Sequence, residues 1–380
     1  MKSLEVTASW NKKFFEDFVA FRQSLYRDHA WALDEHLSDL EKLWGPNSPL
    51  GREFRAYLLR DSQGQVQARA LVSVARAAAE FTALGYYERL EAESGADLLA
   101  RIETDLRTQP FFRVQGDKRL ALRAPMQGHF FNSYRLMVES HEDPFFGEPV
   151  FPASHAEDFR RAGFQMAGQW RTVEIRKDQA VPAFDRIWKA TEPRWNRSGI
   201  KIRPLNLKRW PEELRRLYDV LSETFNQMPN YEPLAWPAFE ALFRDLSFLL
   251  DPRLVLFAEK DGQTEGFVVA VKDALPVLLR LQTRSRRWPW LARLFQLKAL
   301  GELKSHHGRL LVLYIGKKPS SSLPWLGAAL GKKITDEGLR QGYESAYICY
   351  LADKSPIFTS LPGGLRDVTR YALFEKEQPA

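Results

Sequence analysis

A short polar stretch, PMQGHFFNSYR at 125–135, contains the first side chains that could move protons. It follows an apolar run typical of a strand, so its polar groups would lie just beyond a strand end. His129 could take a proton from an amine, because an imidazole titrates near neutral pH. Tyr134 could donate a proton or bind a substrate. A histidine that is simply hydrogen-bonded within a loop is the alternative interpretation.

A second candidate follows the apolar run at 310–315, where the chain breaks and resumes helically near Leu326. A strand that leads into a helix N-terminus is a frequent phosphate site, because the first amides of a helix have no intrahelical partner. The amine of Lys317 could supply charge. Three consecutive hydroxyls could bind the phosphate oxygens, those of Ser320, Ser321 and Ser322. A plain surface turn is the alternative interpretation.

The composition favours a globular cytoplasmic protein of two domains. The chain has 380 residues, of which 44% are hydrophobic, and no apolar run is long enough to span a bilayer. Its one cysteine, Cys349, excludes an internal disulfide framework and a cysteine-based metal cluster. We expect this thiol to be buried and unreactive, and no residue spacing predicts a metal site.

Positive charge is concentrated in one segment. The chain carries 55 Lys and Arg against 48 Asp and Glu, and the window from Arg280 to Arg309 holds eight basic residues and one acid, Glu302. The same window contains tryptophans and leucines at helical spacing. A solvated face, interdomain packing, a lid over an acyl channel, a membrane-surface helix, and a docking site for a carrier protein or tRNA are the interpretations left open.

An internal repeat organises the chain. The hairpin-like stretches FRAYLLRDSQGQVQARALVSV and LVLFAEKDGQTEGFVVAVKD place their turn glycines at Gly64 and Gly262. A glycine followed by an aromatic residue recurs at the same offset of about 200 residues, ahead of two predicted closing strands. We therefore predict a duplicated domain, with residues 1–185 and 205–380 forming the two copies and 186–204 a linker.

Each copy is predicted to run helix, hairpin, helix, strand, helix, strand. The fold class is α/β (α+β), with a mixed, mostly antiparallel sheet flanked by helices in each of two tandem domains. The expected helices are 14–43 with breaks, 95–108, 211–225, 236–246 and 326–341, and the expected strands outside the hairpins are 119–123, 310–315 and 343–351.

This doubled order resembles tandem proteins of the GCN5-related N-acetyltransferase (GNAT) superfamily, and more closely a bacterial group of tandem GNAT-like acyltransferases. The similarity runs along nearly the whole chain. It lies in the stretches FRQSLYRDHAW, LALRAPMQGHFFNSY, PASHAEDFRRAGF, DPRLVLFAEKDGQTEGFVVAVKD and LGAALGKKITDEGLRQGYESAYI.

The resemblance implies that an acyl group passes from a thioester to an amine by direct attack, without a covalent intermediate. Backbone amides near Leu313 and Ile315 would bind the thioester oxygen, and Tyr314 and Tyr350 would lie on the two strands beside it. Gly327 would lie at the start of the cofactor helix. The implied co-substrate is acyl-CoA or an acyl-phosphopantetheine on an acyl-carrier protein, with no other cofactor, and the implied acceptor is a small-molecule amine.

The coenzyme A loop departs from the family pattern. GNAT proteins have Arg/Gln-x-x-Gly-x-Gly/Ala here, whereas this chain has Pro324 and Trp325, and Pro324 has no amide hydrogen to donate. The usual asparagine and tyrosine further on fall near Lys354 and Ser360. Two alternatives therefore stand beside the acyltransferase: an aminoacyl-tRNA-dependent transferase of the Fem type, and a non-catalytic binding protein whose cleft is filled by Trp325 and Leu323.

Overall fold

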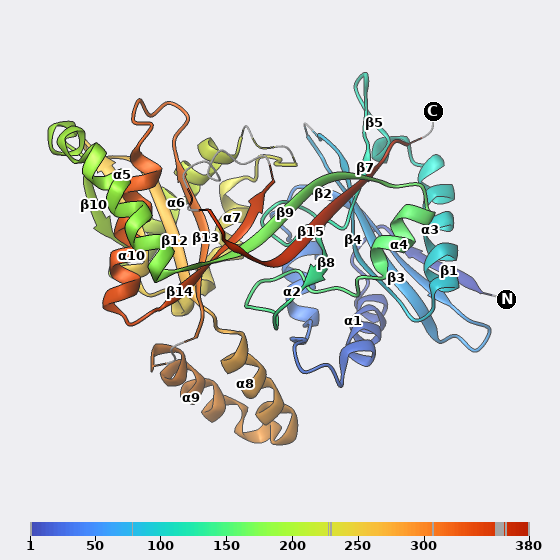
Figure 1. The fold of residues 1–380 in the computed structure, drawn as a ribbon. Helices are drawn as coiled ribbons and strands as arrows, with labels where there is room; N and C mark the ends of the chain where they lie inside the picture. The colour runs from blue at the N-terminus through green and yellow to red at the C-terminus, as the bar shows by residue number, and fades with distance from the viewer. Residues whose placement is uncertain are drawn as a thin grey trace.

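The computed structural model describes residues 2–77, 79–226, 228, 230–305, 308–353, 361 and 363–378. Thirteen strands form one continuous sheet that runs through both halves of the chain (Figure 1). Apart from β8, which pairs with β15 off this path, the strand order is β1-β2-β3-β4-β7-β15-β9-β14-β13-β12-β11-β10. Helices pack on both faces of the sheet, so the fold has three layers.

The N-terminal half contains a four-stranded antiparallel region followed by a helix and a parallel strand. Strand β4 pairs in parallel with β7, and the predicted strand at 119–123 is interrupted between β6 and β7. The bounds are β1 (Ser3–Thr7), α1 (Lys12–Tyr26), α2 (Leu37–Trp44), β2 (Arg52–Arg60), β3 (Val66–Ala75), β4 (Thr82–Arg89), α3 (Ala92–Arg107), β5 (Val114–Gln115), β6 (Lys118–Arg119), β7 (Leu122–Ala124), β8 (Leu136–Ser140) and α4 (His155–Arg161).

The C-terminal half repeats this order. Hairpin β11–β12 matches β2–β3, and the glycines at both turns have positive φ, 82° at Gly64 and 79° at Gly262, which a residue without Cβ adopts freely. The bounds are α5 (Lys177–Ser198), β10 (Lys201–Pro204), α6 (Trp210–Phe225), α7 (Trp236–Phe243), β11 (Val255–Lys260), β12 (Gln263–Lys272), α8 (Leu275–Arg287), α9 (Ala292–Ser305), β13 (Leu310–Lys317), α10 (Leu326–Arg340) and β14 (Ser345–Ala352).

Two long strands join the halves by changing sides. β9 (Gln165–Arg176) pairs with β14 of the C-terminal half, and the last strand, β15 (Arg366–Lys376), pairs with β7 and β8 of the N-terminal half. β9 and β15 also pair with each other along most of their length (Figure 1). Because each strand extends the sheet of the other half, the two repeats are not separate sheets divided at a single point in the sequence.

The segment predicted as a linker, 186–204, requires correction. Most of it belongs to helix α5, which has prolines at 182 and 193 inside it, and the remainder forms strand β10. Proline normally ends a helix because it lacks an amide and crowds the preceding turn. Here packing outweighs that preference: Phe184 is buried, and Trp188 and Trp195 pack against the core formed by α10 and its neighbouring strands.

The helices divide between the two faces of the sheet. One large core contains side chains from α1, α2, α6 and α7 and so spans both halves. On the other face, α3 and α4 cover the N-terminal half, while α10 covers the C-terminal half. Helices α3 and α10 therefore occupy equivalent places, each following the strand that pairs in parallel with its neighbour.

Helices α8 and α9 stand apart from these layers. They form a hairpin between β12 and β13 that projects from the body of the protein (Figure 1). Within the described residues, no helix combines the length and the apolar character that crossing a bilayer requires.

Candidate active site

The parallel strands β13 and β14 separate halfway along their length. They pair at three positions, the last of which joins Val312 to Ile348, and no pairing follows. At the same level β13 has an irregularity against β12, because Tyr314 lies opposite Val269 while Val312 lies opposite Ala270, which leaves Leu313 as an extra residue. Bulges of this kind occur beside active sites because they redirect backbone groups. The backbone around Leu313 therefore borders the opening between the strands.

A cavity of about 250 Å³, here called the aromatic cavity, lies on one side of this opening. Three of the predicted site residues, Tyr134, Tyr314 and Tyr350, meet in its wall although they come from distant parts of the chain. Leu313 and Ile315 line the same cavity. The polar stretch of the N-terminal half thus contributes directly to a site in the C-terminal half, because both belong to one continuous sheet and core.

A second cavity of about 430 Å³, here called the helix cavity, lies between the opening and the start of α10. Val312, Ile315 and Ile348 line both cavities, so they lie back to back across the separated strands. Lys317 and Gly327, both predicted as cofactor-binding residues, line the helix cavity. The rest of its lining is mostly apolar and includes Ile175, Phe184, Leu310, Pro324, Ile334 and Leu361.

The first turn of α10 leaves backbone donors beside the helix cavity. The amide of Leu326 donates to the carbonyl of Leu323, and that of Ala329 to the carbonyl of Trp325. The intervening amides of Gly327 and Ala328 belong to the part of a helix that has no intrahelical acceptor. A Cβ added at Gly327 would meet no atom within 4 Å, so there is open space at the helix start.

The serines of the loop do not line either cavity. Ser320 and Ser322 are exposed, while Ser321 is 8% exposed and its hydroxyl is buried without a hydrogen-bond partner among the described residues. The amine of Lys317 donates to the carbonyl of Ser321 at 3.0 Å and so closes the loop. Of the predicted phosphate ligands, the structure brings Lys317 and Gly327 to the cavity but not the three serines.

Trp325 does not line the helix cavity. Its ring packs edge-on against Trp195 of α5 with centroids 5.6 Å apart, and Leu323 joins the same cluster. Neither of these two side chains is among the lining residues of the helix cavity. Pro324 does line the helix cavity.

The hydroxyl groups of the aromatic cavity are kept protonated at neutral pH. Burial raises the pKa of Tyr314 to about 12, and it raises those of Tyr134 and Tyr350. The Tyr350 hydroxyl donates to the carbonyl of Gly147 at 2.9 Å, whereas no hydrogen bond of this kind ties down Tyr314 among the described residues. Cys349 is 5% exposed, and burial raises the pKa of its thiol well above its usual value, which disfavours a nucleophilic thiolate.

His129 lines neither cavity. Its imidazole is 2% exposed, its Nδ1 accepts from the Phe131 amide at 3.1 Å, and its Nε2 has no partner among the described residues. Burial lowers the pKa of His129 to about 3, with Arg52 as a further cause. The structure thus places this histidine in the core rather than beside the opening between β13 and β14.

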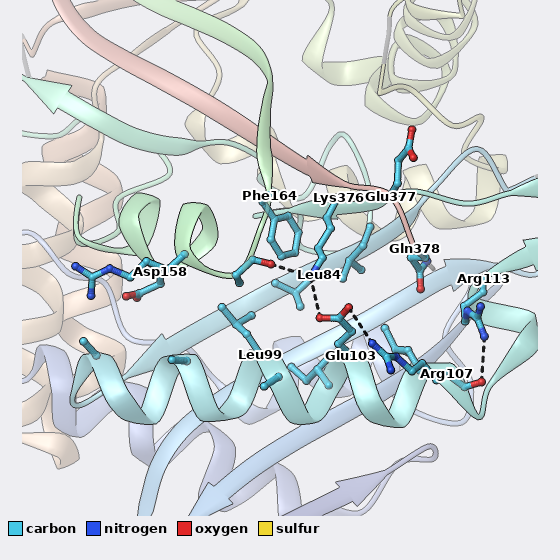
Figure 2. A pocket seen from close by; sticks show the side chains of 18 residues that line it. Leu84, Leu99, Glu103, Arg107, Arg113, Asp158, Phe164, Lys376, Glu377 and Gln378 are labelled. Atoms are coloured by element: carbon cyan, nitrogen blue, oxygen red, sulfur yellow. Dashed lines mark hydrogen bonds and ion pairs between the residues drawn. The ribbon is translucent and has the colours of Figure 1, made fainter. Parts of the chain in front are cut away.

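The N-terminal half has a corresponding cavity of about 320 Å³ between α3, α4 and the end of β15 (Figure 2). Its floor is apolar, with Leu84 and Leu99 among the lining residues. Lys376 reaches across it and donates at 2.8 Å to both Glu103 and the carbonyl of Ala162. These charges compensate one another within the protein.

The start of α3 is closed, unlike that of α10. A Cβ at Gly95 would lie 2.1 Å from the Tyr87 hydroxyl, and the Arg89 side chain lies beside it. Tyr87 and Arg89 both bind Asp158, at 3.0 Å and 2.7 Å. This network occupies the position where α10 has open space, so the start of α10 is more open than that of α3.

Arg135 is the site residue to which the sequence assigns no role. Its guanidinium lines the aromatic cavity, stacked 3.9 Å from the Tyr134 ring and 4.4 Å from the Tyr350 ring. The backbone at Ser133 and Arg135 has positive φ, 89° and 94°, which residues with a Cβ rarely adopt. An arginine within an aromatic stretch is visible in the sequence and could have marked Arg135 as a candidate site residue. The backbone geometry that turns its side chain into the cavity is not visible there.

Comparison with solved structures identifies the architecture. A tandem GNAT protein from the clavulanic acid biosynthesis pathway matches 100% of this chain and 99% of its own at a TM-score of 0.51, with 11% identity. A probable N-acyltransferase from Enterococcus faecalis matches 100% of this chain and 73% of its own at a TM-score of 0.56, with 10% identity. The chain has a tandem GNAT fold. The predictions of the fold class and of the resemblance are confirmed.

Another GNAT protein, from Sphaerobacter thermophilus, covers 99% of this chain and 96% of its own at a TM-score of 0.50 and 14% identity. No family model matches the sequence. Among curated proteins, the bacterial ceramide synthase of Caulobacter vibrioides is 26% identical over 187 residues, or 47% of this chain. The matched region spans about half of that relative, 47% of its length.

Proposed function

We propose that this tandem GNAT-fold protein transfers an acyl group from a thioester to an amine, and that its C-terminal half holds the reacting groups. The observation that carries the proposal is the separation of β13 and β14 beyond Val312, with a cavity on each side of the opening. A donor and an acceptor could approach one another from opposite sides of the sheet there. The relative's name supports an amine acceptor, because a ceramide is an amide of a fatty acid with a long-chain amine.

The helix cavity is the proposed place of the thioester. Its apolar lining suits a long acyl chain. The free amides of Gly327 and Ala328, together with the amine of Lys317, would hold a phosphate of coenzyme A or of phosphopantetheine at the positive end of α10. This set has fewer backbone donors than the glycine-rich loop of the family, because Pro324 contributes none.

The aromatic cavity is the proposed place of the amine. Attack on the thioester carbonyl forms the N–C bond and breaks the C–S bond, and one proton moves from nitrogen to sulfur. Backbone amides at the bulge around Leu313 would stabilise the oxyanion. Tyr314, which is protonated and has no hydrogen-bond partner among the described residues, is the proposed proton donor to the thiolate.

The test is a transfer assay with a long-chain acyl-CoA, and in parallel an acyl-carrier protein, against a panel of amines. The panel contains a sphingoid base, an amino acid and an aminoalkyl phosphate. Release of free thiol together with an N-acyl product detected by mass spectrometry is the expected result. Absence of both thiol release and product with either donor would overturn the proposal.

A further inference from the structure

Arg135 is a buried cation without an acidic partner. It is 8% exposed, and its Nε is buried and makes no hydrogen bond within the described part of the chain. One hydrogen bond of the guanidinium goes to the Tyr134 hydroxyl. No carboxylate of the described residues lies within 4.0 Å of it, and the remaining residues include no Asp or Glu. Buried arginines usually have an ionic partner, because desolvation of the charge is costly.

Aromatic rings hold this cation in place. The faces of Tyr134, Tyr350 and Trp170 lie 3.9, 4.4 and 5.1 Å from the guanidinium carbon. Cation–π contact fixes the orientation of the planar group, and apart from the bond to the Tyr134 hydroxyl no hydrogen bond within the described chain uses its in-plane N–H donors. Unused, oriented donors that line a cavity are suited to a planar or tetrahedral anion.

Backbone strain gathers at the same place. Ser133, Arg135 and Tyr350 all line the aromatic cavity and all have positive φ, 89°, 94° and 57°. Such conformations cost free energy in residues with a Cβ and persist only when the surroundings enforce them. The strain turns the guanidinium into the cavity, and this is a second observation, independent of the missing acid.

We propose that Arg135 binds an anionic group of the amine acceptor, either a carboxylate or a phosphate. The inference rests on the proposed acyl transfer and narrows its acceptor to an amine that carries a negative charge close to the nitrogen. Bidentate contact between the guanidinium and the anion would place the amine toward the opening between β13 and β14.

Three amines with the same two-carbon chain test this inference. Ethanolamine has no anionic group, β-alanine has a carboxylate and O-phosphoethanolamine has a phosphate. We expect at least one of the two anionic amines to raise the Tm by about 2 °C or more, and ethanolamine to leave it unchanged. The anionic amine that raises the Tm shows whether Arg135 prefers a carboxylate or a phosphate. Equal shifts with all three amines, or no shift with any of them, would overturn the inference.

Two variants sharpen the result. Arg135→Gln should abolish the shift, whereas Arg287→Gln, which removes an exposed arginine elsewhere, should retain it. In the absence of ligand, Arg135→Gln should have a Tm close to that of the wild type, because the loss of the cation–π contacts is offset by removal of an unpaired buried charge. A shift that survives in Arg135→Gln, or a marked fall in its ligand-free Tm, would show that the guanidinium is structural. Long-chain acyl-CoA, measured in parallel, should stabilise both variants, so failure of the acyl-transfer proposal is seen separately.

A second inference rests on the projecting hairpin of α8 and α9. Helix α9 and the turn before it are apolar on two sides. Phe295 is half-buried and Ala299 is buried, whereas a second row of large apolar side chains, here called the outer row, is exposed. A helix with two apolar sides normally lies inside a core or a membrane. Five of the eleven exposed large hydrophobic side chains among the described residues fall within 288–300: Trp288, Trp290, Leu294, Leu297 and Leu300, with Trp290 80% exposed.

Unpaired cations accompany the outer row. Arg293 and Lys298 are exposed and form no ion pair within the described chain, while Arg287 stacks on Trp288 at 4.7 Å. Four other basic residues of the segment have acidic partners: Arg280 and Arg284 share Glu302, Arg286 pairs with Asp34, and Arg309 pairs with Asp273. This pairing weakens the case for the predicted tRNA surface, because few free charges remain for a phosphate backbone.

The hairpin is fixed to the body both along α8 and at its return to β13. Arg286 pairs with Asp34, and the Gln282 side chain bonds to the carbonyl of Ala32 at 2.9 Å and to the Asp34 amide at 2.7 Å. Arg309 pairs with Asp273 at 2.7 Å where the hairpin returns to β13. The outer face therefore points in a fixed direction away from the sheet (Figure 1).

We infer that this outer face docks on an anionic lipid bilayer surface. Tryptophan and leucine side chains would enter the boundary between headgroups and acyl chains, while Arg293 and Lys298 would contact anionic headgroups. Neither a second copy of the chain nor RNA matches this combination of apolar side chains and cations equally well. A second copy would place the same positive charges against one another, and RNA would leave the leucine side chains exposed to water. This inference holds whether or not the acyl-transfer proposal is correct.

Vesicle flotation tests the docking. Full-length protein should float with vesicles of phosphatidylcholine and phosphatidylglycerol, and less with phosphatidylcholine alone. Leu294→Ser/Leu297→Ser should lose flotation, and Arg293→Glu/Lys298→Glu should weaken partitioning by about fivefold or more per residue. The matched control Leu90→Ser/Val114→Ser removes exposed apolar side chains elsewhere and should float like the wild type.

Absence of flotation by the wild type would overturn the docking inference, as would equal behaviour of the hairpin and control variants. A concentration-dependent dimer that the leucine variant abolishes, without vesicle binding, would assign the face to a second copy. Salt-dependent RNA binding that needs Arg293 and Lys298 but not the leucines would assign it to RNA.

Discussion

Gly327 offers a substitution that should stabilise the protein and impair donor binding at the same time. It lies in the first turn of α10 with helical backbone geometry, and a side chain there would point into open space in the helix cavity. Replacing a helical glycine by alanine gains about 0.5–1 kcal/mol, because alanine loses less backbone entropy on folding. Gly327→Glu would gain up to about 1 kcal/mol more from the positive end of the helix.

The same glutamate would oppose a phosphate. Two like charges about 4 Å apart repel by about 4 kcal/mol at an effective dielectric constant of about 20. Even one third of that value corresponds to about tenfold in Kd. We therefore expect Gly327→Glu to unfold at a temperature equal to or above that of the wild type while it binds a long-chain acyl-CoA at least about tenfold more weakly.

The assay combines thermal unfolding with isothermal titration calorimetry. Gly327→Ala is the matched control, because it has the same effect on the helix without the charge, and its acyl-CoA affinity should stay within about threefold of the wild type. Unchanged acyl-CoA binding by a well-folded Gly327→Glu variant would refute the assignment of the helix start as a phosphate site.

Three further predictions follow from single side chains. Tyr314→Phe should lower kcat by about 10²-fold or more with little change in KM, measured by thiol release, because it removes the proposed proton donor and no packing; an unchanged kcat would exclude that role. Trp325→Ala should lower stability by about 3–5 kcal/mol in urea denaturation without improving acyl-CoA binding, because the ring packs on Trp195 outside the cavity; tighter binding would show that the ring does obstruct the cleft. Burial raises the pKa of Glu88 to about 7 from 4.5, so its contribution to stability is complete below pH 4.5 and is lost as pH rises through about 7. Glu88→Gln should accordingly reduce the loss of unfolding free energy between pH 5 and pH 8 by about 1–3 kcal/mol, and an identical pH dependence in both proteins would contradict this.

Local patterns in the sequence were sufficient for the repeat and for part of the site. Alternating apolar residues around turns with Gly64 and Gly262 predict both hairpins, and strands 310–315 and 343–351 are recovered as β13 and β14. The residues predicted on those two strands, among them Tyr314 and Tyr350, line the aromatic cavity as expected from parallel neighbours.

Features that depend on long-range packing could not be read in this way. The exchange of β9 and β15 between the halves joins residues about 200 positions apart, and no local pattern specifies which partner a strand takes. Helix α5 contains two prolines that signal a break, yet contact with α10 keeps it helical. The place of His129 in the core and of Arg135 at the cavity is decided by backbone turns within 128–135, which residue types alone do not reveal.

Hydrogen–deuterium exchange in the presence of a long-chain acyl-CoA tests most directly whether the C-terminal half holds the donor. We expect increased protection in the second half of β13 and in the first turn of α10, from Leu326 onward, with little change around α3. Protection confined to α3 and α4, or no protection anywhere, would contradict it.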